Sequence, residues 1–161
     1  MKKVLVAGAT GYLGRFVVKA LKAKGYWVRA LGRSAAKLAP VEEYADEIFI
    51  GEVTNPNSLI GLCDGIDIVF SSVGITRQKD GLTYNDIDYQ ANRNLLTMAE
   101  ASGVSKFMYV HVVNAEKLEH VAMVQAKQAF VDELKPSSLD HTVICPTGFF
   151  SDMEEFLAMA R

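Results

Sequence analysis

The sequence predicts an α/β fold: a Rossmann-type doubly wound parallel sheet with helices on both faces. Short apolar runs alternate with longer helical patterns along the chain, which is the order of elements in such folds. Most of these runs are apolar at successive positions, as strands buried on both faces require. A glycine-rich turn also follows the first run directly. Right-handed crossovers then predict a three-layer α/β/α arrangement with strand order 3-2-1-4-5-6.

Six apolar runs are the predicted strands. They are VLVAG at 4–8, YWVRAL at 26–31, EIFIG at 47–51, IDIVFSS at 66–72, KFMYVHVV at 106–113 and HTVIC at 141–145. In the predicted strand order the chain reverses its winding direction between the first and fourth strands. Ligands of such sheets bind in the crevice at that point, so we expect the functional site there.

Helical patterns fill the intervals between strands. The first has one apolar face and ends at Gly25; the face contains Leu13, Phe16, Val17, Ala20 and Leu21. A second helix is predicted over 83–102, where Thr83 and Asp86 form a weak capping box. Asp86 and Asp88 are interpreted as solvated charges at the start of that helix. A third helix is predicted over 117–134 and a last one from Phe149 onward.

Composition narrows the class of protein. The chain has 161 residues, 50% of them hydrophobic and 22% charged, which excludes disorder and predicts one domain over 1–161. Seventeen basic and nineteen acidic residues nearly balance, so we expect no nucleic-acid or membrane-surface partner. No apolar run approaches the ~20 residues of a membrane span, and we expect a soluble, cytoplasmic protein.

Two cysteines, Cys63 and Cys145, lie far apart in the sequence. So few cannot build a disulfide framework or supply a recognisable metal-ligand spacing. We interpret both as small buried residues in a reducing compartment, and we expect no metal site.

The glycine-rich turn VLVAGATGYLGRF is the most specific signal in the sequence. Gly8 allows a tight turn, Gly11 lets the backbone approach a pyrophosphate, and Gly14 lets the helix pack closely on the strand. The start of the following helix offers free N–H groups to phosphate oxygens. We therefore predict a dinucleotide site, rather than a purely structural turn, and count Thr10, Tyr12 and Leu13 in it.

Two arginines suggest which dinucleotide is bound. An acidic residue at the end of the second strand would bind the ribose 2′-hydroxyl of NAD, but here that region reads ALGRS, with Arg33. Arg15 follows the last glycine of the turn. Guanidinium groups bind phosphate through charge-assisted hydrogen bonds, so the sequence favours NADP over NAD. The alternative for either arginine is a solvated surface charge.

Several motifs together resemble the atypical short-chain dehydrogenase/reductase superfamily, and within it the NAD(P)-binding, NmrA-like branch. The motifs are GATGYLG, GRS, GEVTNP, DYQANRNLL, GVSKFMYVHV and SLDHTVICPTGFF, and they cover nearly the whole chain. The resemblance implies that Glu52 and Val53 flank the adenine and that Pro146 lies near the nicotinamide. It places Ser71, Ser72, Val73 and Gly74 along the dinucleotide. It also implies that Asn92 supports the turn after the fourth strand.

One departure from the family pattern concerns catalysis. Members that reduce carbonyl groups carry Ser after the fifth strand and Tyr-x-x-x-Lys on the next helix. Lys127 matches the lysine, whereas the tyrosine position is Met123 and the serine position is His111. His111 is a candidate acid or base, with a structural histidine as the alternative. Lys127 is a candidate ribose ligand, with a solvated helix charge as the alternative.

Other candidate residues carry less weight. Tyr84 and His120 are further candidates for catalysis, and His141 is expected at the surface. The resemblance also implies that the part of the protein that binds substrate is largely absent from this chain.

We consider three functions. The first is an NADP-dependent oxidoreductase acting on an unidentified small carbonyl-type substrate. The second is a non-catalytic sensor of NAD(P) that signals to a regulatory protein partner. The third is a structural or interaction domain. A homo-oligomer is also an expectation, because exposed apolar surface favours self-association.

Overall fold

A computed structural model of the chain describes residues 1–75 and 81–149. The strands are β1 (Lys3–Ala7), β2 (Trp27–Gly32), β3 (Glu47–Ile50), β4 (Ile68–Ser71), β5 (Lys106–Val110) and β6 (Asp140–Ile144). The α-helices are α1 (Tyr12–Ala23), α2 (Ala35–Glu42), α3 (Asn92–Ala101) and α4 (Ala122–Leu134). Shorter helical segments are η1 (Pro56–Leu59), the π-helix η2 (Asn85–Ala91) and η3 (Ala115–Lys117).

The strands form a six-stranded sheet in the order β3-β2-β1-β4-β5-β6, and each neighbouring pair is parallel. The predicted fold class and strand order are confirmed. In β1, successive residues are buried in turn against opposite faces of the sheet. Leu5 belongs to the core on one face, and Val4 and Val6 belong to the core on the other. This burial on both faces explains why the strands read as unbroken apolar runs.

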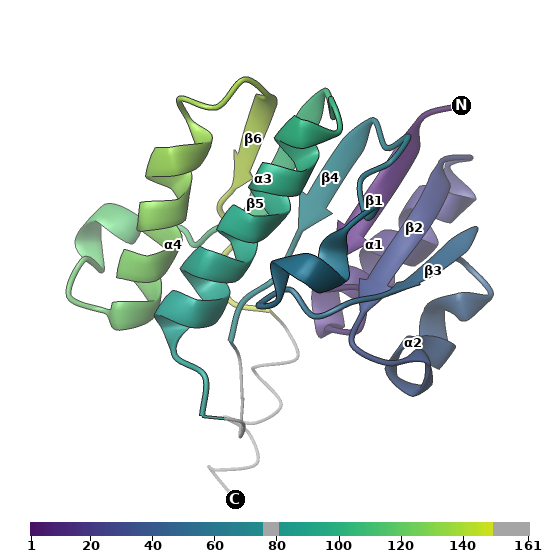
Figure 1. The fold of residues 1–161 in the computed structure, drawn as a ribbon. Coiled ribbons are helices and arrows are strands. Elements are labelled where there is room, and N and C mark those ends of the chain that lie inside the picture. The colour runs from purple at the N-terminus through teal and green to yellow at the C-terminus, as the bar shows by residue number, and fades with distance from the viewer. Residues whose placement is uncertain (76–80, 150–161) are drawn as a thin grey trace, which may run out of the picture.

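The helices cover the sheet in two layers (Figure 1). Helices α3 and α4 lie over one face, where Leu95 and Phe130 pack on strand residues such as Phe107. Helices α1 and α2 lie over the other, where Val18 and Leu38 complete the second core. Each fully buried Leu or Phe side chain contributes roughly 1.5–3 kcal/mol, so two cores hold the sheet rigid beneath its loops.

The first helix forms as predicted, but its buried face differs. The side chain of Phe16 is 59% exposed, and Ala20 is also exposed. The buried positions are Gly14 and Val18. Gly14 is buried because α1 packs so closely on β1 that this position has no room for a side chain. Leu13, Val17 and Leu21 of the predicted face are half-buried and pack against the second core, so the buried face keeps these three residues and includes Gly14 and Val18 in place of Phe16 and Ala20.

Helix α2 has no counterpart among the predicted helices. It has only eight residues, it contains Pro40, and two of its side chains, Leu38 and Val41, are buried. So short and weakly patterned a segment lacks the periodicity that reveals a helix.

Two other predicted helices have different boundaries. The predicted 117–134 helix begins at Ala122, because the chain turns through Asn114, which has a positive φ of 53°, and forms η3 first. The predicted 83–102 helix divides into η2 and α3. The helix predicted from Phe149 onward lies outside the described residues, apart from Phe149 itself.

The cysteines differ in exposure. Cys63 is buried, and burial raises the pKa of its thiol to about 12. Cys145 is exposed, so the expectation that both are buried is wrong. It follows β6, where the chain leaves the sheet. Among the described helices, none is long and apolar enough to cross a membrane.

Candidate functional site

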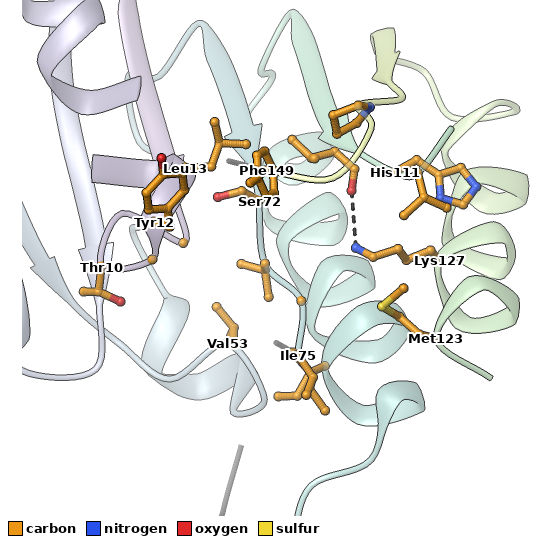
Figure 2. Close-up of a pocket in the computed structure, with 18 of the residues that line it drawn as sticks. Thr10, Tyr12, Leu13, Val53, Ser72, Ile75, His111, Met123, Lys127 and Phe149 are labelled. Carbon is orange, nitrogen blue, oxygen red and sulfur yellow. Dashed lines mark hydrogen bonds between the residues drawn. The ribbon is translucent and has the colours of Figure 1, made fainter. Parts of the chain in front are cut away.

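A cavity of about 630 Å³ opens at the carboxyl ends of the strands, within the volume range of cofactor and ligand pockets. It lies at the predicted point between β1 and β4. The predicted residues that line it are Gly8, Thr10, Gly11, Tyr12, Leu13, Arg33, Glu52, Val53, Ser72, Val73, Gly74, His111, Lys127 and Pro146. Figure 2 shows Thr10 and Tyr12 on one side of the cavity and Met123 and Lys127 on the other.

The glycine turn forms the first side of the cavity from backbone alone. Gly8 has a φ of 86°, which favours glycine. A Cβ on Gly14 would lie 2.0 Å from the carbonyl oxygen of Gly8, so strand and helix touch there through backbone. Gly14 therefore supports the turn from beneath and is not among the described residues that line the cavity.

The same turn leaves donors available to a ligand. Gly11 is the N-cap of α1 and accepts the N–H of Arg15, but no side chain caps the helix. The N–H groups of the first helical turn have no partner within a helix. Gly11, Tyr12 and Leu13 line the cavity, so this helix start fits the diphosphate of a dinucleotide in both charge and space.

Two charged side chains meet at the end of the cavity near β2 and β3. Nε of Arg33 lies 3.9 Å from Oε2 of Glu52, and both side chains are partly exposed. The carbonyl oxygen of Glu52 accepts the hydroxyl of Ser58 at 2.9 Å. Arg15 behaves differently: its side chain is exposed, donates from Nε to the carbonyl oxygen of Thr10 at 2.9 Å, and is not among the described residues of the cavity wall.

The loop after β4 crosses the middle of the cavity. Ser72, Val73 and Gly74 line it, whereas Ser71 is fully buried beneath. Oγ of Ser71 donates to Oδ1 of Asn92 at 2.6 Å. The Asn92 amide in turn donates to the carbonyl oxygen of Val73 at 3.2 Å. Asn92 therefore supports this turn, as the resemblance implied, and Ser71 shares that supporting role.

Lys127 and Asp88 form a buried ion pair at the second side of the cavity. Nζ of Lys127 lies 3.1 Å from Oδ1 of Asp88, whose side chain is fully buried. Oδ2 of Asp88 accepts the N–H of Ile75 at 3.1 Å. Burial raises the pKa of Asp88, while the Lys127 ammonium and the Ile75 N–H oppose that rise.

The interpretation of Asp88 as a solvated charge is therefore wrong, because η2 turns its side chain inward. Asp86 is the residue that fits the interpretation. It accepts the N–H of Thr83 at 2.8 Å and completes the predicted capping box. Lys127 is likewise buried rather than a solvated helix charge.

His111 lies at the end of β5 and is 5% exposed. Its Nε2 is 3.1 Å from Oε1 of Gln128, while Nδ1 has no hydrogen-bond partner among the described residues. Burial lowers the pKa of His111, opposed by the hydrogen bond that Nε2 of His111 donates to Oε1 of Gln128. The ring is therefore neutral near pH 7, where it can accept or donate one proton.

Sequence reasoning missed the apolar wall near Lys127. Ile75, Ile87, Val112 and Leu118 line the cavity there, together with Met123. Each comes from a separate loop or helix, so no local pattern marks them. Tyr84 and His120 are exposed and are not among the described lining residues, and His141 lies half-buried in β6. Among the described residues, no group of His, Cys, Asp and Glu side chains could hold a metal ion.

The cavity has one end lined by the backbone at the start of α1 and one apolar end where Lys127 is the ammonium group of the described wall. Such a cavity can hold an extended anionic ligand whose reactive end is kept from water. The residue at the family's tyrosine position, Met123, has no proton to donate. His111 and Lys127 are the titratable groups that the described wall offers at this end.

Comparison with known sequences also indicates a dinucleotide-binding protein. The NAD(P)H-binding family matches residues 8–157. Over 93% of the chain, the sequence is 31% identical to a photosystem II assembly factor, Ycf39, from Cyanophora paradoxa, of which it covers 46%. It is 28% identical to a chloroplastic divinyl chlorophyllide a 8-vinyl-reductase from Zea mays, covering 93% of the chain and 41% of the reductase. The chain thus spans about half the length of these curated relatives or less.

Solved structures agree with the predicted fold. A proposed NAD-dependent epimerase/dehydratase from Bacillus halodurans superposes with a TM-score of 0.80 and 26% identity, over 91% of this chain and 71% of that protein. The fold that the two proteins share and the glycine turn of this chain are both typical of proteins that bind a nicotinamide dinucleotide. The chain therefore belongs to the NAD(P)H-binding family within the atypical short-chain dehydrogenase/reductase superfamily.

Proposed function

We propose that this chain is the cofactor-binding part of an NADP-dependent oxidoreductase. The observation that carries the proposal is the start of α1, where backbone without a capping side chain lines the cavity. The same cavity is lined by both Gly11 and Lys127. The bound cofactor would supply the hydride chemistry. The chain itself binds and orients the dinucleotide and excludes water from its reactive end.

NADP is preferred over NAD because of Arg33. Its guanidinium group lies at the cavity wall, and the residue that faces it, Glu52, is 3.9 Å away and partly exposed. An exposed ion pair of this length is weak, so a phosphate group can compete with Glu52 for the Arg33 guanidinium. Arg15 is not among the described residues of the cavity wall, so we expect it to contribute less than Arg33 to the preference for NADP.

At the other end of the cavity, Lys127 is the proposed ribose ligand. Its ammonium group donates to the carbonyl oxygen of Val110 at 3.3 Å and lines the cavity. His111 is the remaining candidate for proton transfer to the substrate. The maize relative is named as a reductase, which favours a reductive reaction on a small organic substrate. The wall around Met123 favours an apolar substrate group at the site of reduction.

A second candidate function is a sensor of NAD(P) that binds without turnover. The observation that favours it is Met123, which removes the family's usual proton donor from the cavity wall. The algal relative is named as an assembly factor rather than as an enzyme. In this case binding would alter a surface that a regulatory protein partner contacts.

Three further expectations belong to this proposal. The motifs quoted above favour the NmrA-like branch of the superfamily. The near-balance of charges favours a protein without nucleic-acid partners, and a cytoplasmic location stays an expectation. Self-association is expected to involve exposed apolar residues such as Phe16 and Ile60, which are 59% and 73% exposed.

Calorimetric titration with NADPH, NADH and their oxidised forms tests the cofactor. We expect tighter binding of the two phosphorylated forms. Arg33→Ala should weaken NADPH by about tenfold while leaving NADH nearly unchanged, because NADH has no 2′-phosphate for Arg33 to bind. Arg93→Ala is the matched control, since Arg93 is exposed on α3 and pairs with Glu133. Equal losses for NADPH and NADH would refute the 2′-phosphate assignment.

Turnover separates the two functions. NADPH oxidation should be followed with a panel of aldehydes, ketones and quinones. Consumption of NADPH that depends on the added compound supports the oxidoreductase. Tight binding with no turnover, together with unequal affinity for the reduced and oxidised forms, supports the sensor.

A further inference from the structure

A buried carboxylate lies directly behind the cavity wall, at a position that the proposed function does not use. Asp88 is 0% exposed, and it is not among the described residues that line the cavity. Lys127, which does line it, is 8% exposed. The pair thus bridges η2 and α4, with its acidic member hidden and its basic member at the cavity.

Glycine at position 74 makes room for this pair. A Cβ on Gly74 would lie 2.7 Å from Oδ1 of Asp88 and 3.1 Å from Nζ of Lys127. Any larger residue would therefore displace one of the two charged groups. The loop after β4 is held to the same carboxylate, because the N–H of Ile75 donates to Oδ2. One side chain thereby fixes both the lysine and the loop that faces the ligand.

The ammonium group of Lys127 keeps bonding capacity for a ligand. It donates to the carbonyl oxygen of Val110 at 3.3 Å and meets Oδ1 of Asp88 at 3.1 Å. An ammonium group has three donors, so at least one is left over from these contacts with described residues and can serve the cavity. Oδ1 of Asp88 accepts no hydrogen bond among the described residues, so its contact with Lys127 is mainly one of charge.

We propose that Asp88 is a positioning residue that holds the charged Lys127 at the cavity wall, so that its free N–H meets a ribose hydroxyl of the bound dinucleotide. This inference rests on the proposed function. A buried ammonium group without a nearby negative charge loses its proton more readily, because burial disfavours the charged form. Asp88 supplies that charge from the side away from the ligand and so leaves the donor directed at the cavity free.

Few other groups near Lys127 could produce the same dependence of binding on pH. From β5, the ring of Tyr109 lies 5.3 Å from Nζ of Lys127, and burial raises the pKa of its hydroxyl, so Tyr109 stays neutral. His111, beyond the end of β5, has a lowered pKa because it is buried, and it is neutral above pH 7. Asp88 on η2 is the acidic partner itself. A pH dependence that appears above pH 7 on removal of Asp88 therefore reports on Lys127.

The test is the dissociation constant for NADPH between about pH 7 and pH 9, where Lys normally stays charged. The wild type should bind with constant affinity over this range. Asp88→Asn retains the shape of the side chain and an acceptor for Ile75 but removes the charge, so its affinity should fall as pH rises. Asp86→Asn is the matched control, because Asp86 lies on the same segment and accepts the N–H of Thr83. The affinity of this variant for NADPH should stay constant over the pH range, as in the wild type.

A second variant covers the case in which Asp88→Asn does not fold. Asp88→Asn with Lys127→Met replaces the ion pair by two neutral groups, so no buried charge is left alone. It should bind NADPH about tenfold more weakly than the wild type because the ammonium donor is lost, with no dependence on pH.

The outcomes separate the two hypotheses. Failure of the wild-type protein to bind NADPH or NADH would overturn the proposed function, and the role of Asp88 with it. Binding by the wild type, together with the same affinity and pH profile in Asp88→Asn, would overturn the positioning role alone. Wild-type affinity in the double variant would overturn the positioning role together with the assignment of Lys127 as ribose ligand, while cofactor binding by the chain would stand.

Discussion

The two ends of the cavity are built in different ways. The phosphate end consists of backbone from one short stretch, in which Gly8, Gly11 and Gly14 shape the turn between β1 and α1. The end that we propose holds a ribose, called the ribose end, depends on side chains from distant segments, with Lys127 of α4 at the wall and Asp88 of η2 behind it. The first needs only the absence of side chains, whereas the second needs two opposite charges to be buried together. Substitutions of the cavity-facing backbone at the phosphate end should therefore weaken binding, whereas those at the ribose end should lower stability as well; Gly14, which lies beneath the cavity, is the exception.

The largest expected effect is on stability at the ribose end. Lys127→Ala leaves the fully buried carboxylate of Asp88 without its partner. Removal of one member of a buried ion pair costs about 3–5 kcal/mol, which urea unfolding measures directly. Lys135→Ala is the control on the same helix segment, because its side chain is 59% exposed and its pair with Asp132 is weak. Equal losses in the free energy of unfolding for the two variants would mean that the buried pair contributes no more to stability than an exposed one.

The second effect concerns the strand–helix contact of the glycine turn. A Cβ at Gly14 would lie 2.0 Å from the carbonyl oxygen and 2.7 Å from the carbonyl carbon of Gly8, and backbone cannot move aside cheaply. Gly14→Ala should therefore destabilise the protein by about 1–3 kcal/mol. At Gly11 a Cβ would lie 3.3 Å from the same oxygen, and its φ of −77° suits any residue. Gly11→Ala is thus the comparison, and similar unfolding midpoints for the two variants would contradict the close contact.

The two ends of the cavity also differ in how far the sequence predicts them. The glycine spacing, the strand before it and the helix after it are local, so the fold class, the strand order and the phosphate end could all be predicted from the pattern. The ribose end could not. Asp86 and Asp88 look alike in the sequence, and only the π-helical turn of η2 decides that Asp86 caps the helix while Asp88 is buried. A change of helix type over seven residues leaves no mark in hydrophobic periodicity.

The apolar stripe of α1 shows a related limit. Phe16 has the spacing of a core residue but is 59% exposed, and its ring instead contacts Tyr12 at a centroid distance of 5.2 Å. The helix packs through Gly14, where a Cβ would lie 2.0 Å from the carbonyl oxygen of Gly8 and no side chain fits. Binary patterns count apolar side chains and give glycine no weight, so they misplace a face that is centred on glycine.

The third effect is on binding at the phosphate end. Gly11→Val adds a branched side chain where the backbone faces the cavity, while the exposed position leaves the two cores intact. NADPH affinity should fall by about tenfold or more, which corresponds to about 1.4 kcal/mol, with a smaller loss of stability than in Gly14→Ala. Titration calorimetry and urea unfolding on the same sample measure both quantities. A variant that unfolds earlier but binds normally would reverse the assignment of the two ends.

The smallest effect is the pH dependence contributed by His111. Burial lowers the pKa of His111 from 6.5, so the unfolded chain binds this proton more tightly than the folded protein does. Its contribution to stability is complete above pH 6.5 and is lost as pH falls toward the lowered folded-state pKa. The slope from one such group is at most about 1.4 kcal/mol per pH unit. His111→Gln should flatten this part of the profile in urea unfolding between about pH 6.5 and pH 5, because Gln does not titrate there. An unchanged slope would show that the His111 ring is solvated rather than held against Gln128, and the ribose end would then contain one buried ionisable pair and no neutral histidine beside it.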